Sequence, residues 1–401
     1  MNVRCPAIRE HTCQAVLCRQ AVGPDMDDTL IVIQEGRHNL SIIIFIIILG
    51  ILLISHEGGH LLVAKMNGIH VVEFMIGMGP KIAQFEKGGT IYSLRVLPIG
   101  GACVFEDDVT QEGGQQDKAP ESQALEDKND RPKGKFFNDA SLGARFATVV
   151  AGPLANIILA FIFSVIIVNF SLTDLPVVVS VMEGYPAEEA GIEAGDTIIS
   201  VNGERVYLYR EVSVISQLNR GKDYTIVVER DGERLTYTFS PLYDEEEGRY
   251  YMGITGGEYV QFTGVKALQY GVYEVRYAAT SVYKSLLQII QGQVSSEDVS
   301  GVVGVANLVS ETYDEVKTYG WLSTLLTMMN LAALLSVNLG IINLLPIPAL
   351  DGGRILLMAI ELVRGKPIPP EKEGVVNTIG FVLLMVLMVF LFFNDIKNIF
   401  F

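Results

Sequence analysis

The residues with the clearest chemistry lie in the segment His56-Glu57-Gly58-Gly59-His60. Residues i and i+4 share one face of an α-helix, so His56 and His60 can present two imidazoles to one metal ion. Zinc suits this ligand set, and it lowers the pKa of a bound water toward neutrality. Glu57 can reach such a water. The pattern therefore predicts a hydrolytic zinc site in which Glu57 is the general base that activates a zinc-bound water.

Two histidines do not complete a catalytic zinc site, which usually has three protein ligands and one open position. Met66 stands where some soluble HExxH proteases carry a third histidine, and His70 lies off the shared face. The best remaining ligand is Asp351 in "NLLPIPALDGGRILL" (Asn343–Leu357), where two prolines stop a helix and two glycines free the backbone. Taken alone, this Asp-Gly pair is equally consistent with an ordinary turn.

The elements that must position these residues are predicted to be membrane helices. The chain of 401 residues is 49% hydrophobic and only 19% charged, which favours a membrane protein. Its net charge of −16 argues against nucleic acid as a partner. The four cysteines show no spacing typical of a disulfide framework or a cysteine zinc site. Apolar segments long enough to span a bilayer occupy residues 40–64, 146–170, 322–345 and 375–393.

Lysine and arginine near the ends of these spans predict their orientation. The loops 65–145 and 346–374 carry basic residues near the membrane and are expected on the cytoplasmic side, with the residues between spans two and three outside. The metal site should then lie near the cytoplasmic face, because His60 closely precedes Lys65. Residues 1–39 are expected to be a disordered leader or the product of a start codon placed too far upstream, and residues 394–401 a tail.

The long outer segment has the pattern of a small α+β domain. Residues 175–243 contain strand-like alternation in "TIISVNG" and in "YTIVVERDGERLTYTF", the latter with an Asp-Gly turn. This segment resembles a PDZ domain, which takes an extended peptide onto a sheet edge. Binding of a cut substrate end and simple exclusion of bulky substrates both remain open. Residues 244–321 are expected to be a linker with an amphipathic helix on the membrane surface.

The combination of motifs resembles the site-2 protease family of intramembrane zinc metalloproteases, and within it the bacterial regulator of sigma-E protease type with one PDZ domain. "HEGGH" lies in the first span, "AGPLANIILA" in the second and "SVNLGIINLLPIPALDGG" in the third. "IGMGPKIAQFEKGGTIYSLRVLPIGGACVFEDD" is similar to the family's reentrant β region. The resemblance implies a polytopic α-helical membrane protein with four transmembrane helices, a membrane-associated β-hairpin region and one extracytoplasmic PDZ-like α+β domain.

The resemblance also implies roles for individual residues. His56, His60 and Asp351 fall on the zinc ligands, Glu57 on the catalytic glutamate, and Asn338 and Asn343 on asparagines that hold the substrate backbone. Those two asparagines could equally join helices within the bundle. The implied activity is a zinc metalloendopeptidase of the cell membrane that performs regulated intramembrane proteolysis. The implied substrates are single-span membrane proteins, such as anti-sigma factors or signal-peptide remnants.

Two other classes of function stay open on the sequence alone. In a membrane scaffold the PDZ-like domain would act by itself, and replacement of Glu57 would be tolerated. In a metal transporter the histidines and Asp351 would form an ion path, as ionisable residues in membrane spans often do. The presence of Glu57 beside a complete ligand set favours the protease over both alternatives.

Overall fold

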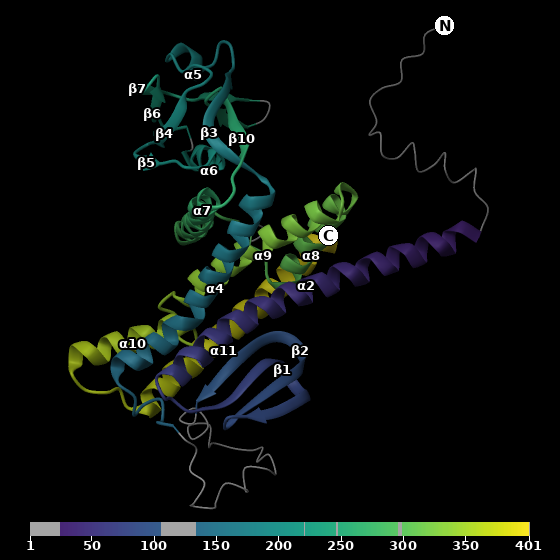
Figure 1. Ribbon diagram of the computed structural model, residues 1–401, viewed down its shortest axis with the longest axis vertical. Helices are drawn as coiled ribbons and strands as arrows, with labels where there is room; N and C mark the ends of the chain where they lie inside the picture. The colour runs from purple at the N-terminus through teal and green to yellow at the C-terminus, as the bar shows by residue number, and fades with distance from the viewer. Residues whose placement is uncertain (1–24, 106–133, 220, 246–247, 296–298, 401) are drawn as a thin grey trace, which may run out of the picture.

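The computed structural model describes residues 25–105, 134–219, 221–245, 248–295 and 299–400. In this part of the chain, four helices are long and apolar enough to cross a membrane. Figure 1 shows these helices with an α+β domain at one end and a β-hairpin region toward the other. The predicted fold class is therefore confirmed. Residues 1–24 of the expected leader, and most of the polar stretch after Phe105, lie outside the described residues.

The four spanning helices are α2 (Asp25–Met66), α4 (Leu142–Phe170), α9 (Trp321–Asn343) and α11 (Pro370–Phe400). Helix α2 continues back to Asp25, so the end of the expected leader is helical in the structure. The segment expected as a loop between spans three and four contains helix α10 (Asp351–Arg364). This helix has an extended residue, Leu350, before it and a left-handed glycine, Gly365, after it, which are typical helix ends.

Helix α4 lies between α2 and α9 and contacts both along small residues. A Cβ added to Gly59 of α2 would lie 2.3 Å from the carbonyl oxygen of Ala151, and one added to Gly340 of α9 would lie 3.0 Å from that of Pro153. Small residues let helix backbones approach this closely, which is how membrane helices gain packing energy. The three helices therefore form a close-packed unit around α4.

The hairpin region consists of two long strands, β1 (Val71–Lys87) and β2 (Thr90–Phe105). Residues 71–76 pair on one side with 91–94 and on the other side with 101–105. Among the described residues no further strand pairs with 101–105, so this segment is an edge of the sheet. It packs against α2, and it therefore brings a sheet edge beside the helix that carries the His-Glu motif.

The PDZ-like domain (residues 172–261) contains a sheet in the order β10-β3-β4-β6-β7, with β5 paired to β4. The Asp231-Gly232 turn joins β6 to β7 with φ values of 52° and 83°, as an Asp-Gly hairpin requires. Its core is apolar, with Ile198, Tyr224 and Ile226 fully buried. The elements are β3 (Leu172–Val181), α5 (Pro186–Glu189), β4 (Thr197–Val201), β5 (Glu204–Arg205), α6 (Tyr209–Asn219), β6 (Tyr224–Arg230), β7 (Glu233–Phe239), β8 (Leu242–Asp244), β9 (Arg249–Tyr251) and β10 (Ile254–Gln261).

One buried ion pair fastens two strands of this domain. The Asp196 carboxylate accepts hydrogen bonds from Nε and Nη2 of Arg230 at 2.6 and 2.7 Å. Burial of Asp196 works toward a higher pKa, but the hydrogen bonds and charge of Arg230 outweigh it and hold the pKa of Asp196 below its usual range. The domain therefore gains stability from the ionised form of Asp196.

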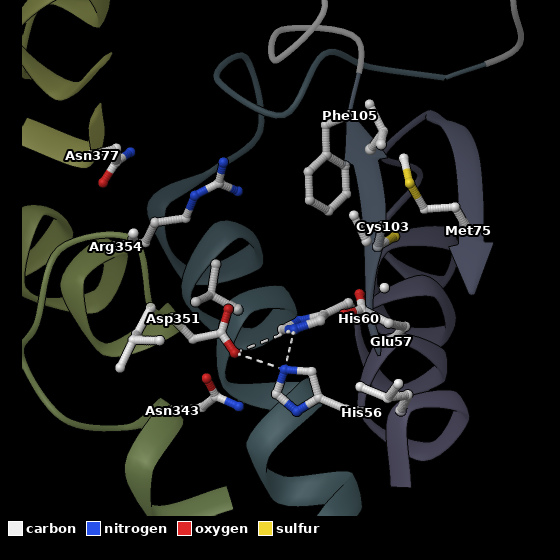
Figure 2. Close-up of a pocket in the computed structure, with 18 of the residues that line it drawn as sticks. His56, Glu57, His60, Met75, Cys103, Phe105, Asn343, Asp351, Arg354 and Asn377 are labelled. Carbon is white, nitrogen blue, oxygen red and sulfur yellow. Dashed lines mark hydrogen bonds and ion pairs between the residues drawn. The ribbon is translucent and has the colours of Figure 1, made fainter. Parts of the chain in front are cut away.

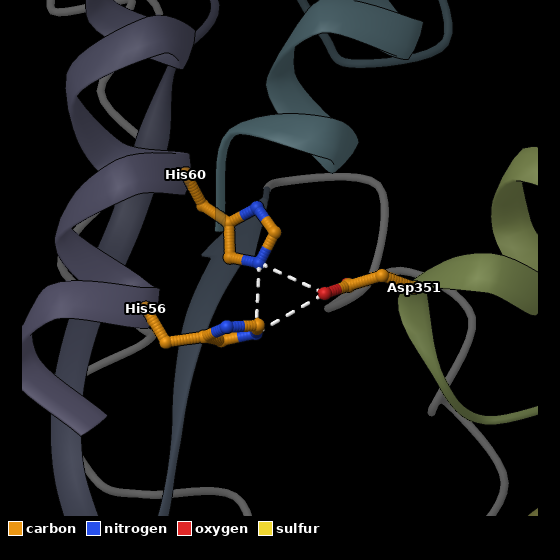
Figure 3. A group of neighbouring side chains, drawn as sticks. All are labelled: His56, His60 and Asp351. Atoms are coloured by element: carbon orange, nitrogen blue, oxygen red, sulfur yellow. Dashed lines mark hydrogen bonds and ion pairs between the residues drawn. The ribbon is translucent and has the colours of Figure 1, made fainter. Parts of the chain in front are cut away.

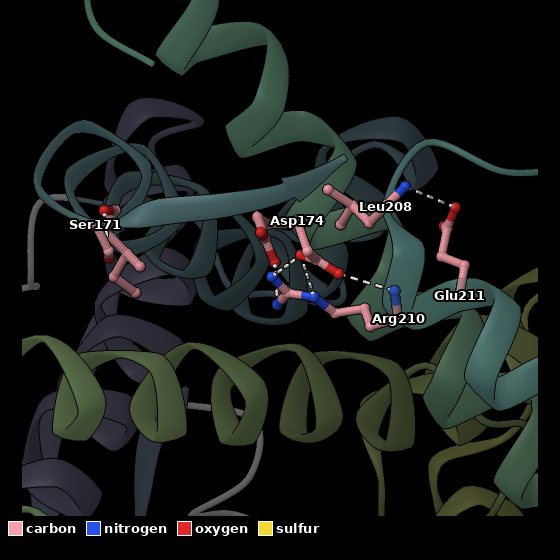
Figure 4. Close-up of polar contacts among 7 residues, drawn as sticks. Ser171, Asp174, Leu208, Arg210 and Glu211 are labelled. Atoms are coloured by element: carbon pink, nitrogen blue, oxygen red, sulfur yellow. Dashed lines mark hydrogen bonds and ion pairs between the residues drawn. The ribbon is translucent and has the colours of Figure 1, made fainter. Parts of the chain in front are cut away.

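Two further helices connect the PDZ-like domain to the bundle. Helix α7 (Val265–Ile290) packs Gly271 and Ala278 against α4 and α9. Figure 4 shows Arg210 of α6 beside Asp174, to which it donates a hydrogen bond. Arg210 also donates to Glu274 of α7 at 3.1 Å, and this bond joins the domain to α7. Helix α8 (Val302–Val316) is followed by a 3-10 turn (Lys317–Tyr319). The carboxylate of Asp395 in α11 caps the start of α8, because it accepts hydrogen bonds from the backbone N–H groups of Gly301 and Gly304 at 2.9 and 2.8 Å.

Candidate active site

Three of the residues singled out by the sequence meet at one point (Figure 3). The Nε2 atoms of His56 and His60 lie 3.3 Å apart on one face of α2. Oδ2 of Asp351 lies 3.1 Å from Nε2 of His56 and 3.4 Å from Nε2 of His60. Both histidines are buried, and Asp351 is nearly so. The structure thus brings together side chains that are almost 300 residues apart in the chain.

A tight turn after α9 places Asp351 beside the two histidines. A Cβ on Gly352 would lie 2.0 Å from the carbonyl oxygen of Leu345, and a Cβ on Gly353 would lie 2.5 Å from that of Ile347. No residue with a side chain fits at either position without moving the backbone. The two glycines therefore let the first turn of α10 pack onto the end of α9, and this packing aims Asp351, the first residue of α10, at α2.

The arrangement fits a zinc ion. A tetrahedral ion with bonds of about 2.0–2.1 Å holds its ligand atoms about 3.3–3.4 Å apart, close to the separations of 3.1–3.4 Å found here. Oδ2 of Asp351 is buried and accepts no hydrogen bond from the described residues, a state that a cation would relieve. Two imidazole nitrogens and one carboxylate oxygen also leave a fourth position open, as catalytic zinc sites do.

Residues of helix α4 contact the outer ring nitrogens of the two histidines. Nδ1 of His60 donates to the carbonyl oxygen of Thr148 at 2.8 Å, and the carboxamide of Asn156 lies 3.5 Å from Nδ1 of His56. A Cβ on Gly152 would lie only 2.2 Å from Nε2 of His60. These α4 residues were not predicted from the sequence. An asparagine within the apolar run "AGPLANIILA" was the available signal.

Glu57 is placed beside the cluster but outside it. The backbone N–H of Cys103 in β2 donates a hydrogen bond to its carboxylate. A Cβ on Gly101 would lie 3.1 Å from Cγ of Glu57, so the strand has no room for a side chain there. The edge segment of β2 therefore sets the position of Glu57, which is 8% exposed and faces the cavity described next.

The cluster opens into a cavity of about 1040 Å³ (Figure 2). Its walls come from α2, β1, β2, α4, the α9–α10 turn and α11. The volume is at the upper end of ordinary ligand pockets, so a stretch of extended polypeptide has room there. Asn343 lines this cavity, whereas Asn338 is not among its lining residues. Asn377 of α11, which the sequence analysis missed, also lines it, and its buried Oδ1 has no hydrogen-bond partner among the described residues.

Comparisons with known proteins identify the family of this chain. The model of peptidase family M50 matches residues 44–387. The chain is 35% identical over 430 residues to the zinc metalloprotease RasP of Shouchella clausii, covering 90% of this chain and 99% of that protein. It is 31% identical over 425 residues to the regulator of sigma-W protease RasP of Bacillus subtilis, again covering 90% and 99%.

Among solved structures, the PDZ domain of an SdrC-like protein from Listeria monocytogenes matches 21% of this chain and 87% of its own, with 23% identity and a TM-score of 0.19. The family match and the full-length relatives confirm the predicted peptidase activity and the predicted zinc cofactor. The chain belongs to peptidase family M50, the site-2 protease family, and is a membrane zinc metallopeptidase.

Proposed function

We propose that this protein cleaves peptide bonds within the transmembrane segments of single-span membrane proteins. The observation that carries the proposal is the position of the ligand cluster, which opens into a large cavity between membrane-spanning helices with a sheet edge on one wall. A relative's name, regulator of sigma-W protease, supports anti-sigma factors as substrates. Signal-peptide remnants have the same single-span architecture and form the second substrate class.

The protein residues have separate tasks in this reaction. His56, His60 and Asp351 hold the zinc ion, which, when bound, polarises the scissile carbonyl and lowers the pKa of water. Glu57 takes the proton from the attacking water and later gives it to the leaving amine. The carboxylate of Glu57 is already held by the Cys103 backbone, so it needs little rearrangement before it accepts the proton.

The substrate must be unwound before it is cut, because helical carbonyls are hydrogen-bonded and shielded. The edge segment at residues 101–105 lines the cavity, and an extended chain adds to it as a further strand, as in other strand-addition complexes. Asn343, at the cavity wall, supplies a donor and an acceptor on the opposite side. Asn338 lies five residues earlier in α9, outside the cavity lining, and either holds the substrate backbone or joins helices within the bundle.

We place the protein in the cell membrane, with the site near the cytoplasmic face and the PDZ-like domain outside. The basic residues that flank spans one and two, and those between spans three and four, support this orientation. The opposite placement of the PDZ-like domain and the hairpin region in Figure 1 supports it too. The domain is tied to α7 by ion pairs, which suits a fixed filter that excludes bulky substrates.

The test is cleavage of a tagged single-span protein by the detergent-purified enzyme, with the cut mapped by mass spectrometry. We expect the cut inside the apolar segment, and faster cleavage when a helix-breaking residue is introduced near it. Asn343→Leu should slow cleavage without loss of zinc. Cuts that fall only in the soluble tails, or equal rates for stiff and weakened helices, would contradict intramembrane cleavage.

A further inference from the structure

The two zinc-binding histidines must each find an acceptor for their second ring nitrogen. Nε2 of His56 and Nε2 of His60 point into the cluster. In a neutral imidazole that gives one nitrogen to a metal, the other nitrogen carries the hydrogen and donates it. For His60 the acceptor is the carbonyl oxygen of Thr148, at 2.8 Å. His56 needs an equivalent partner at Nδ1.

The only side chain that the described residues offer to Nδ1 of His56 is the carboxamide of Asn156. This asparagine is completely buried in the middle of α4. Its nitrogen, Nδ2, lies 3.5 Å from Nδ1 of His56, while its oxygen, Oδ1, has no hydrogen-bond partner among the described residues. A carboxamide in an apolar helix at this depth is costly, so its presence requires a partner.

A half-turn of the carboxamide exchanges its oxygen and nitrogen, which are nearly the same size. The oxygen then faces Nδ1 of His56 and accepts its hydrogen, which gives the oxygen a partner and lets Nδ1 act as the donor. Oγ of Ser336 in α9 donates to the backbone carbonyl oxygen of Asn156 at 2.7 Å, so this contact between α9 and α4 does not involve the carboxamide.

We propose that Asn156 is the positioning residue of His56, with its carboxamide oxygen accepting the Nδ1 hydrogen and thereby turning Nε2 toward the zinc ion. This inference deepens the proposed function and rests on it for the identity of the bound ion. The two ligand histidines are then oriented in different ways. His60 is oriented by the backbone carbonyl of Thr148, which no substitution of Thr148 removes, whereas His56 depends on one side chain.

The test measures zinc affinity directly, by competition with a chelator, in the purified full-length protein. Asn156→Leu keeps the size of the side chain and removes the acceptor, and partners of this kind change metal affinity by about 10- to 100-fold. We expect a loss in that range. Asn156→Asp keeps an acceptor and should hold zinc within a few-fold of wild type. Cobalt-substituted protein should show a changed absorption spectrum only for Asn156→Leu.

Ser336→Ala is the matched control, because it removes a buried hydrogen bond between the same two helices without touching His56. Its zinc affinity should equal that of wild type. The proposal is overturned if Asn156→Leu binds zinc as tightly as wild type, or if Asn156→Asp and Ser336→Ala weaken zinc binding as much as Asn156→Leu does. The zinc affinities are measured without substrate. If wild-type protein binds zinc but cuts no substrate, the proposed function is contradicted, while the comparison of zinc affinity among the Asn156 and Ser336 variants still tests the role of Asn156.

Discussion

The two glycines inside the His-Glu motif should respond in opposite ways to alanine. A Cβ on Gly59 would lie 2.3 Å from the carbonyl oxygen of Ala151 and 2.8 Å from Cβ of Ala155, whereas a Cβ on Gly58 would meet nothing within 4 Å. Carbon atoms in contact are separated by about 3.5 Å. Gly59→Ala must therefore push α4 away from α2 by about 1 Å, while Gly58→Ala fits as it is.

Moving α4 away from α2 would disturb the hydrogen bond that orients His60. The bond from Nδ1 of His60 to Thr148 is 2.8 Å long, and a shift of about 1 Å takes it beyond hydrogen-bonding distance. Replacing a helical glycine by alanine gains up to about 1 kcal/mol at either position. Overpacking at Gly59 costs about 1–3 kcal/mol. Gly58→Ala should thus stabilise the protein slightly, and Gly59→Ala should be neutral to about 2 kcal/mol less stable.

The assay is zinc content and thermal unfolding of the two variants, purified in parallel with wild type, followed by cleavage of a single-span substrate. We expect Gly59→Ala to lose zinc affinity and most activity, and Gly58→Ala to keep both. Equal behaviour of the two variants, with full zinc content in each, would refute the argument that close contact between α2 and α4 positions the ligands.

Three further predictions concern other parts of the chain. Nη2 of Arg145 in α4 lies 2.5 Å from Oε1 of Glu361 in α10, and both side chains are part-buried. Arg145→Met should therefore cost about 2 kcal/mol by leaving the Glu361 carboxylate without this partner. The double replacement with Glu361→Met should recover most of that loss in thermal melts. The pKa of Asp196 is lowered in the folded protein, so its stabilising effect is complete above its unfolded-state pKa and disappears as the pH falls through its folded-state pKa. At pH 7, Asp196→Asn should therefore melt at a lower temperature than wild type. The difference in melting temperature should disappear in acid. Asp395 caps α8, so Asp395→Ala should lower the free energy of unfolding by about 1 kcal/mol. It should also increase proteolysis near residue 301, and unchanged proteolysis would contradict the capping role.

Much of the framework could be predicted from the sequence because it depends on local pattern. The four spans follow from continuous apolar runs, and the β6–β7 hairpin follows from alternation around Asp231-Gly232. The pairing of His56 with His60 follows from helix geometry alone. Their meeting with Asp351 is a contact between distant parts of the chain, to which the proline and glycine context of Asp351 and the family resemblance pointed.

Other features could not be predicted because they arise from packing between helices. The sequence shows two glycines in the motif, but only the structure shows that Gly59 contacts α4 and Gly58 does not. The Asn156 carboxamide beside His56 depends on how α4 is turned against α2. Helix α10 was expected as part of a loop, since prolines and glycines dominate the start of that segment and mask the amphipathic helix that follows them.

The central claim is that Glu57 does the proton transfer at a zinc ion held by His56, His60 and Asp351. The most direct test compares wild type, Glu57→Gln and Asp351→Ala for zinc content and for cleavage of one tagged single-span substrate. Our account predicts that Glu57→Gln binds zinc normally and cuts at least about 100-fold more slowly, while Asp351→Ala loses both zinc and activity. Comparable cleavage by all three proteins, or full zinc content in Asp351→Ala, would contradict it.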